Sequence, residues 1–483
     1  MFSNTAARAF RVLLSVVAMV LPLPARASAA ARLRRDPASV PPSGATSNAE
    51  RATPRRKRSA TSPNPPALLT MPGYHGTLAA VRNLGRHGVP VTTADPERFT
   101  RGAWSKYTTE SVRCPPVRDT DRFIEWLLRF GREREPHVLL PTCDDTAFLY
   151  SLHRDELAKY FYLSVPKVEV LHGLLNKRLL MERAREVGLI TPQSWTPRNA
   201  AEVAELAREA RFPLLIKPTT QVLFDPRSKG LMVTERERFV ETYEKLSRDR
   251  YGRALRDYDA SVTQPIVQEF FAEAATSGIY SICGHARDGR VVEARSARKV
   301  LQWPRRLGIG VCFEAAPLRT DLLEALGRLI ASVGFNGTFE AEFVQDGERS
   351  LLIDFNPRFY SQMGFDVARG LPLPLMAYED AIGRSLIDDA ERKQNGNGAD
   401  SGVKAYAHGA AFKVLLGAQR VAGALSKDEE HKWRKWYDEL GEARVDAVAD
   451  ADDRAPEIVD LMNIAQDVAR HPLRFVSVIA LNR

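Results

Sequence analysis

Two neighbouring segments of alternating polar and apolar residues constrain the fold of this chain more than any other feature. The first spans residues 337–344 and contains Glu342, and the second contains Asp354, Asn356 and Arg358. The polar residues between the segments predict a turn that joins two adjacent strands. Because strand side chains alternate between two faces, Asp354 and Asn356 share one face, and we expect Glu342 to lie opposite Asp354.

Two carboxylates and an amide that converge at one place predict a cation site. Mg²⁺ prefers oxygen ligands, holds one or two carboxylates and fills its remaining positions with phosphate oxygens and water. Glu342, Asp354 and Asn356 are therefore the predicted metal ligands, and the planar guanidinium of Arg358 is suited to a phosphate or carboxylate. The alternative is an amphipathic hairpin whose polar face is solvated.

This segment resembles the metal-binding signature of the ATP-grasp superfamily. In that signature an acidic strand residue precedes an acid-x-Asn-x-Arg element, and Glu342, Asp354, Asn356 and Arg358 match its order and spacing. Asp354 stands where the family more often has glutamate, so its shorter side chain reaches less far. The resemblance implies a two-lobed ATP-grasp domain that uses ATP and Mg²⁺ (or Mn²⁺).

Three lysines are candidates for contact with the nucleotide phosphates. Lys177 opens a predicted helix, where a lone lysine is normally a surface charge, and Lys217 ends an apolar strand, where a buried lysine needs a partner. The resemblance implies that both contact phosphates. The loop of residues 219–230 would cover the phosphates, but it holds a single glycine, so Lys229 is predicted to replace some of the backbone amides of the family loop.

A further apolar strand turns polar at Gln268 and Glu269, just before Phe270 and Phe271. It resembles the hinge strand against which adenine packs in the family. The resemblance implies that Glu269 approaches the exocyclic amine and that the backbone of Phe271 reads the ring edge. Glu273 would reach the ribose hydroxyls, or it is simply solvated.

Arg298 begins a basic, glycine-containing loop that ends near residue 310, beside the predicted metal strands. We predict that it binds the γ-phosphate or an acidic substrate. The alternative is an ordinary basic surface turn.

The segment before the predicted ATP-grasp domain has a Rossmann-like pattern of alternating strands and helices. The predicted strands are 67–70, 89–93 and 137–141, and the predicted helices are 77–87 and 121–134. There is no GxGxxG motif, so a dinucleotide site is poorly supported. Asp144 and Asp145 follow the third strand, where open α/β sheets place ligand-binding loops. The alternative is that one of them caps the next helix.

Charge and cysteine content narrow the class of partner. The net charge of +9 arises from residues 1–65, which hold eleven basic and two acidic residues, so the other 418 residues are neutral overall. This removes the argument from composition for nucleic-acid binding. The four cysteines have no CxxC spacing and are expected to be reduced thiols.

The N-terminus has the shape of a secretory signal. Arg8 and Arg11 precede an apolar run, residues 12–23, which is too short to span a bilayer and is followed by small residues. An enzyme that needs ATP is supplied with it in the cytosol, so we expect a cytoplasmic protein in which residues 1–65 are not part of the folded enzyme. A real targeting role is the alternative.

The predicted organisation is therefore α/β, with four parts along the chain. These are a basic leader at 1–65, a Rossmann-like pre-ATP-grasp domain at 66–170, the ATP-grasp domain at 171–386, and a linker with a helix-rich tail at 387–483.

The resemblance implies a carboxylate–amine ligase that converts a small-molecule carboxylate into an acylphosphate and joins it to an amine. Arg358, Lys217 and Arg298 would be its catalytic residues. A non-catalytic ATP-binding regulatory module and an exported binding protein are the alternatives.

Overall fold

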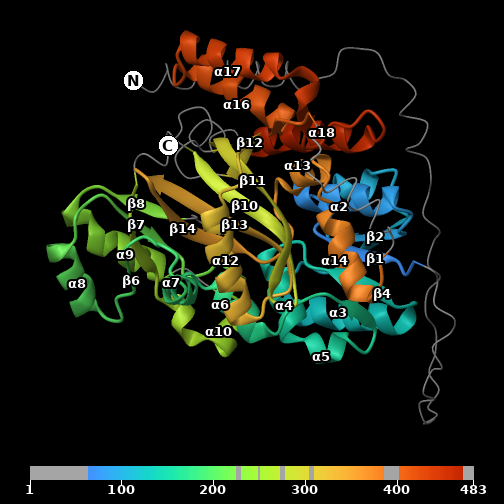
Figure 1. Ribbon diagram of the computed structural model, residues 1–483, viewed down its shortest axis with the longest axis horizontal. Coiled ribbons are helices and arrows are strands. Elements are labelled where there is room, and N and C mark those ends of the chain that lie inside the picture. Colours follow the sequence, from blue (N-terminus) through green and yellow to red (C-terminus); the bar gives the residue numbers. More distant parts are fainter. Residues whose placement is uncertain are drawn as a thin grey trace.

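The computed structural model describes most of the chain that follows the N-terminal leader. The described residues are 64–224, 230–248, 251–271, 278–303, 309–385 and 402–471. The predicted leader lies outside them except for its last two residues. Within them the chain forms three β-sheets with helices packed around them (Figure 1).

The first sheet is parallel, with strand order β3-β2-β1-β4-β5. All four residues of β1 are buried, as expected for a central parallel strand covered on both faces. The bounds are β1 (Ala67–Thr70), β2 (Val91–Asp95), β3 (Glu110–Arg113), β4 (His137–Leu140) and β5 (Phe161–Leu163). The sequence predicted β1, β2 and β4. It did not predict β3, which has a single apolar residue, or β5, which is three residues long.

Helices cover both faces of this sheet. Helix α3 has a clear apolar face, where Phe123, Leu127 and Phe130 are buried at helical spacing. The helical elements in this part of the chain are α2 (His75–Arg86), η2 (Gly102–Trp104), α3 (Thr120–Glu133), α4 (Asp144–Leu152), α5 (Arg154–Leu157), α6 (Val168–Leu175) and α7 (Lys177–Glu186). Of these, α6 and α7 contact β14 (Arg349–Asn356) of the third sheet.

The second sheet is small and antiparallel, with strand order β6-β9-β7-β8. Its strands are β6 (Ser194–Trp195), β7 (Leu214–Lys217), β8 (Leu231–Val233) and β9 (Ile266–Glu269). The helical elements near it are α8 (Ala200–Glu209), η3 (Arg236–Arg238), α9 (Phe239–Ser247), α10 (Arg253–Tyr258) and η4 (Ala260–Thr263). One face of β7 and β9 carries Leu214, Ile216 and Val267 into a core shared with these helices, and the other face carries Lys217.

The third sheet has seven strands in the order β14-β13-β10-β11-β12-β15-β16. Its first five strands are β10 (Ile279–Arg287), β11 (Arg290–Trp303), β12 (Ile309–Ala315), β13 (Gly337–Asp346) and β14 (Arg349–Asn356). Leu326 and Leu329 of α12 (Thr320–Val333) pack on the sheet face that bears Phe339 and Phe343. The opposite face meets α13 (Met363–Ala368) and α14 (Leu373–Ile382), which also contact α2 of the parallel-sheet domain.

The C-terminal segment joins the body of the molecule. Its elements are β15 (Ala405–Ala407), α16 (Gly409–Ala422), α17 (Lys427–Glu439), η5 (Gly441–Ala443), β16 (Arg444–Asp446) and α18 (Ala455–Arg470). The two strands extend the seven-stranded sheet, and α18 reaches the parallel-sheet domain (Figure 1). The sequence predicted helices here and missed both strands, and the predicted final strand lies outside the described residues.

Two general expectations can be compared with this fold. The α/β class is confirmed, and all four cysteines are free. Among the described helices, none is both long and apolar enough to cross a membrane.

Candidate active site

Strands β13 and β14 bring the predicted acidic residues together. Glu342 pairs directly with Asp354, and Asn356 pairs with Glu340 one step along the same face. The predicted strand pair and its register are therefore confirmed. The ligand roles of Glu342, Asp354 and Asn356 stay predictions.

Each of these two carboxylates is paired with a lysine. Nζ of Lys177 donates to Oδ1 of Asp354 at 2.5 Å, and Nζ of Lys299 donates to Oε1 of Glu342 at 2.7 Å. Burial alone would raise the pKa of Asp354, but the charge and hydrogen bond of Lys177 outweigh it and hold that pKa below its ordinary value. Asp354 is thus held in its ionised form, and both carboxylates already have a cationic partner.

Lys177 owes its position to the start of α7. The Asn176 side chain accepts hydrogen bonds from the backbone N–H groups of Arg178 and Leu179 and so caps this helix. The backbone N–H of Lys177 donates to the carbonyl of Thr219, in the loop that follows β7. The helix start and the predicted phosphate loop are therefore held together.

Lys217 lies at the end of β7 and faces the same cluster. Burial lowers its pKa to about 8, and the positive charge of Lys177 adds to the effect, while Asp354 and Glu342 oppose it. Within the described parts of the chain, its ammonium has no carboxylate within 4.0 Å. It is a cation placed for a partner that the described residues do not supply.

Glu340 is a site residue that the sequence analysis missed. Its carboxylate accepts hydrogen bonds from the side-chain amides of Asn356, at 2.9 Å, and Gln362. Burial raises its pKa to about 7, and the negative charge of Glu342 adds to the rise. The signal was available, because Glu340 and Glu342 are two residues apart and so share a strand face.

Arg358 connects the seven-stranded sheet to the parallel-sheet domain. Its Nε donates to Oδ1 of Asp144 at 2.8 Å, and its Nη2 donates to Oδ1 of Asn356 at 2.8 Å. Asp144 is the first residue of α4, and its carboxylate turns to Arg358. The open α/β end and the acidic strands therefore meet at one place.

The second acid of this loop has a different partner. Oδ1 of Asp145 accepts the backbone N–H of Leu223 at 2.6 Å, and burial raises the pKa of Asp145 to about 6. Leu223 belongs to the predicted phosphate loop and has a φ of 47°, a left-handed conformation that costs energy for leucine. Asp145 therefore holds this loop against the parallel-sheet domain.

Arg298 is not brought to the cluster. It pairs with Tyr280, which pairs in turn with Phe343, so it lies on the sheet face opposite Glu342. Its side chain is exposed, whereas the next residue, Lys299, reaches the acidic face. The basic residue that the sequence indicated at this position is therefore displaced by one, and the adjoining residues 304–308 are not described.

The predicted adenine strand is present as β9. Gln268 is buried on the face that carries Lys217, and its Nε2 donates to Oγ of Ser194 at 3.0 Å. The Glu269 side chain is exposed and accepts the backbone N–H of Gln193 at 3.3 Å. Phe270 and Phe271 follow the strand and are half-buried, whereas Lys229 and Glu273 lie outside the described residues.

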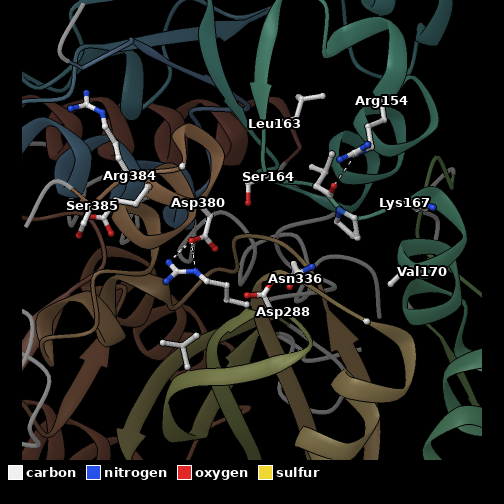
Figure 2. Close-up of a pocket in the computed structure, with 17 residues that line it drawn as sticks. Arg154, Leu163, Ser164, Lys167, Val170, Asp288, Asn336, Asp380, Arg384 and Ser385 are labelled. Carbon is white, nitrogen blue, oxygen red and sulfur yellow. Dashed lines mark hydrogen bonds and ion pairs between the residues drawn. The ribbon is translucent and has the colours of Figure 1, made fainter. Parts of the chain in front are cut away.

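A cavity of about 920 Å³ lies elsewhere, and it shares no residue with this cluster. Its lining includes Lys167, the turn at Asp288, and Asp380 at the end of α14. Figure 2 shows Arg384 directed away from Asp380, which is instead engaged by Arg287 through hydrogen bonds. The predicted metal ligands and phosphate-binding lysines therefore lie outside this cavity.

Comparison with solved structures places the fold. Biotin carboxylase of Campylobacter jejuni, in a complex with β,γ-ATP, matches with a TM-score of 0.52 and 13% identity over 67% of this chain and 72% of that one. The chain has the ATP-grasp fold. The biotin carboxylase domain of Hydrogenobacter thermophilus 2-oxoglutarate carboxylase, in a complex that includes MgADP, shares the ATP-grasp fold at a TM-score of 0.51 and 15% identity, over 67% of this chain and 71% of that one.

The curated proteins that are similar in sequence to this chain include a ligase. The D-aspartate ligase of Enterococcus faecium is 30% identical over 143 residues, which cover 27% of this chain. The match spans 34% of that ligase, so this chain corresponds to about a third of its length. No protein-family model matches the chain.

The donor set of this site fits a hard divalent cation. Three carboxylates and one amide oxygen gather on the shared face of β13 and β14, and burial together with the negative charge of Glu342 raises the pKa of Glu340. A divalent cation relieves repulsion between carboxylates, and oxygen-only donors suit Mg²⁺ or Mn²⁺. Glu342, Asp354 and Asn356 are the residues that would hold it.

Proposed function

We propose that this protein is an ATP-dependent ligase that joins a small-molecule carboxylate to an amine. The observation that carries the proposal is the direct pairing of Glu342 with Asp354 amid Lys177, Lys217 and Lys299. The two acids are paired with Lys177 and Lys299, and Lys217 lies near both of them. Carboxylates suit a metal ion and lysines suit phosphates, so this arrangement suits a metal–nucleotide complex. The MgADP complex of the ATP-grasp relative and the similarity to D-aspartate ligase support this assignment.

The reaction would proceed in two displacements. The substrate carboxylate attacks the γ-phosphorus of ATP, the bond to the ADP oxygen breaks, and an acylphosphate forms. The amine then attacks the acyl carbon, phosphate leaves, and the amine loses a proton to solvent. Positioning and charge stabilisation do most of the work in phosphoryl transfer, so no nucleophilic side chain is required.

The cationic residues would each contact a different part of the nucleotide phosphates. Lys177 and Lys217 would neutralise the phosphates, and Arg358 would hold the transferred phosphoryl group beside the carboxylate. Divalent metal bound by Glu342, Asp354 and Asn356 would offset charge on the phosphate oxygens. We keep Arg298 as a proposed contact only for an acidic substrate approaching from the outer face of β11.

The base would lie against β9. Gln268, Glu269 and the backbone of Phe270 and Phe271 are the proposed adenine contacts, and Lys229 and Glu273 are proposed for the phosphates and ribose. Because ATP is supplied in the cytoplasm, we propose that the reaction takes place there.

The test is release of ADP and phosphate by the full-length protein with Mg-ATP. Amino acids and related small carboxylates and amines are offered singly and in pairs, with Asp354→Asn as the control. We expect release that requires two substrates and is lost in Asp354→Asn. Binding of ATP without turnover on any pair would instead favour a regulatory nucleotide-binding module, and failure to bind ATP would overturn both readings.

A further inference from the structure

Two histidines and an aspartate meet at a place that the ligase site does not use. His75 begins α2, His408 lies between β15 and α16, and Asp460 lies in α18. Each offers one atom able to bind a metal ion, and these three atoms lie within 4.8 Å of one another. The cluster therefore joins three parts of the chain that are far apart in sequence.

The two imidazoles are in contact. Their ring centroids are 4.4 Å apart with an angle of 67° between the planes, and Nε2 of His408 lies 2.8 Å from Oδ2 of Asp460. His408 and Asp460 are buried, so the group is shielded from water. Imidazole nitrogen and carboxylate oxygen are the ligand types that zinc takes most readily beside thiolate.

His75 supplies the observation that points to a ligand. Its Nε2 atom is buried and has no hydrogen-bond partner in the part of the chain that the structure describes. A buried polar atom without a partner is costly, and native proteins rarely leave one. Burial lowers the pKa of His75 well below its ordinary value, and the neighbouring His408 adds to this, so the ring is neutral and keeps a lone pair for a metal ion.

Arg101 completes the surroundings. Its Nε donates to Oδ1 of Asp460 at 2.6 Å, which leaves Oδ2 directed at His408. Such an outer hydrogen bond fixes the orientation of a carboxylate ligand. Arg101 also places one positive charge near the cluster, and this charge should weaken the binding of a cation there.

We propose that His75, His408 and Asp460 form a zinc site with water in the fourth position. In a tetrahedral site two ligand atoms of one zinc ion lie about 3.3 Å apart, so His408 and Asp460 would separate by roughly 0.5 Å as the ion replaces the proton between them. The ion would tie α2, α16 and α18 together. Because His75 directly follows Tyr74, it would also fix the turn that leads from β1 toward the ligase site.

The test is metal binding by the full-length protein after removal of metal with a chelator. Titration with Co²⁺ is followed by visible absorption, and titration with Zn²⁺ by the melting temperature. We expect one equivalent of Co²⁺ to give the absorption of a four-coordinate nitrogen–oxygen site, and Zn²⁺ to raise the melting temperature until one equivalent is bound.

Variants distinguish this site from the predicted magnesium site. His75→Gln and Asp460→Asn should lose the Co²⁺ absorption, whereas Asp354→Asn should keep it. His172→Gln is a matched control. His172 also bonds an aspartate, Asp259, at 2.8 Å, but among the described residues it does not belong to a group of three possible metal ligands. Wild-type protein that binds no more Co²⁺ or Zn²⁺ than His75→Gln would overturn the proposal.

Discussion

Lys217 carries a positive charge where burial opposes that charge. Its pKa falls from the ordinary 10.5 to about 8. Between these two pH values the unfolded chain binds more protons at this residue than the folded chain, so this residue makes stability rise with pH in that window. Below pH 8 the full penalty is present, and the nucleotide phosphates of the proposed reaction would relieve it.

We therefore expect Lys217→Met to be more stable than the wild type at pH 7, by up to about 3 kcal/mol, because one pKa unit corresponds to about 1.4 kcal/mol. The gain should shrink as the pH rises from 8 to 10.5. Urea unfolding of both proteins across this range is the measurement. A variant that is less stable at pH 7, or a difference that does not change with pH, would contradict this account.

Arg358 and Arg298 offer a comparison between two arginines near the same sheet. Arg358 is bonded to Asp144 and Asn356, whereas Arg298 is exposed on the opposite face. Removing one charge-stabilising donor typically costs a factor of roughly 100–1,000 in turnover. We expect Arg358→Ala to lose that much ligase activity and Arg298→Ala to lose little, measured as ADP release under saturating substrates.

Equal losses from both substitutions would instead show that the outer face of β11 takes part in the reaction. The adjacent variant Lys299→Ala provides the internal reference, because Lys299 contacts Glu342 directly.

At the scale of elements, the start of α7 positions the site. Asn176 caps this helix and also lies 3.3 Å from Asp259, which is held by His172. The cap thereby connects the helix that carries Lys177 to the smaller sheet lobe. Local stability and nucleotide binding should depend on the same residue.

We expect Asn176→Ala to destabilise the protein by about 0.5–2 kcal/mol and to raise the KM for ATP, because the first turn of α7 loses its acceptor. Asn199→Ala is the matched control, since Asn199 caps α8 through Glu202 and lies away from the cluster. It should cost similar stability without a change in KM. A shift in KM in both variants would indicate a general effect of destabilisation.

The sequence predicted long, periodic elements well and short ones poorly. Helix α3 and strands β13 and β14 show clear periodicity, whereas β15 and β16 contain only three residues each and β3 has one apolar residue among four. The equally short β1 and β4 were predicted because three of the four residues in each are apolar. The sequence also did not indicate that Lys299, and not Arg298, lies on the face of Glu342. Alternation along β11 shows that the two side chains point to opposite faces, but it does not reveal which face carries the acids.

At the scale of the molecule, the C-terminal segment is fastened to the N-terminal domain by buried charge. Arg82 of α2 donates from Nε to Oδ2 of Asp453 at 2.9 Å and from Nη2 to the carbonyl of Val448 at 2.8 Å. Asp453 also accepts the hydroxyl of Ser105 at 2.6 Å. These partners are more than 340 residues apart, so no local pattern in the sequence indicates them.

We expect Asp453→Ala to destabilise the protein by about 3 kcal/mol, because it removes the closer carboxylate of the buried Arg82 guanidinium and leaves only Asp450, at 3.8 Å, among the described carboxylates. Lys106→Ala removes a nearby exposed pair with Asp452 and should change stability little. Thermal unfolding and limited proteolysis of both variants are the measurements. Equal stability of the two variants would show that the C-terminal segment is not held through Arg82.

The two lysine–carboxylate pairs also determine how the proposed ligands would enter. A metal ion alone must displace the ammonium groups of Lys177 and Lys299 from Asp354 and Glu342 and leave them without counter-charge. Phosphates supply that counter-charge, so each ligand should raise the affinity for the other by the same factor. We therefore expect ion and nucleotide to bind cooperatively. The fraction of sites occupied should follow the concentration of the ion–nucleotide complex.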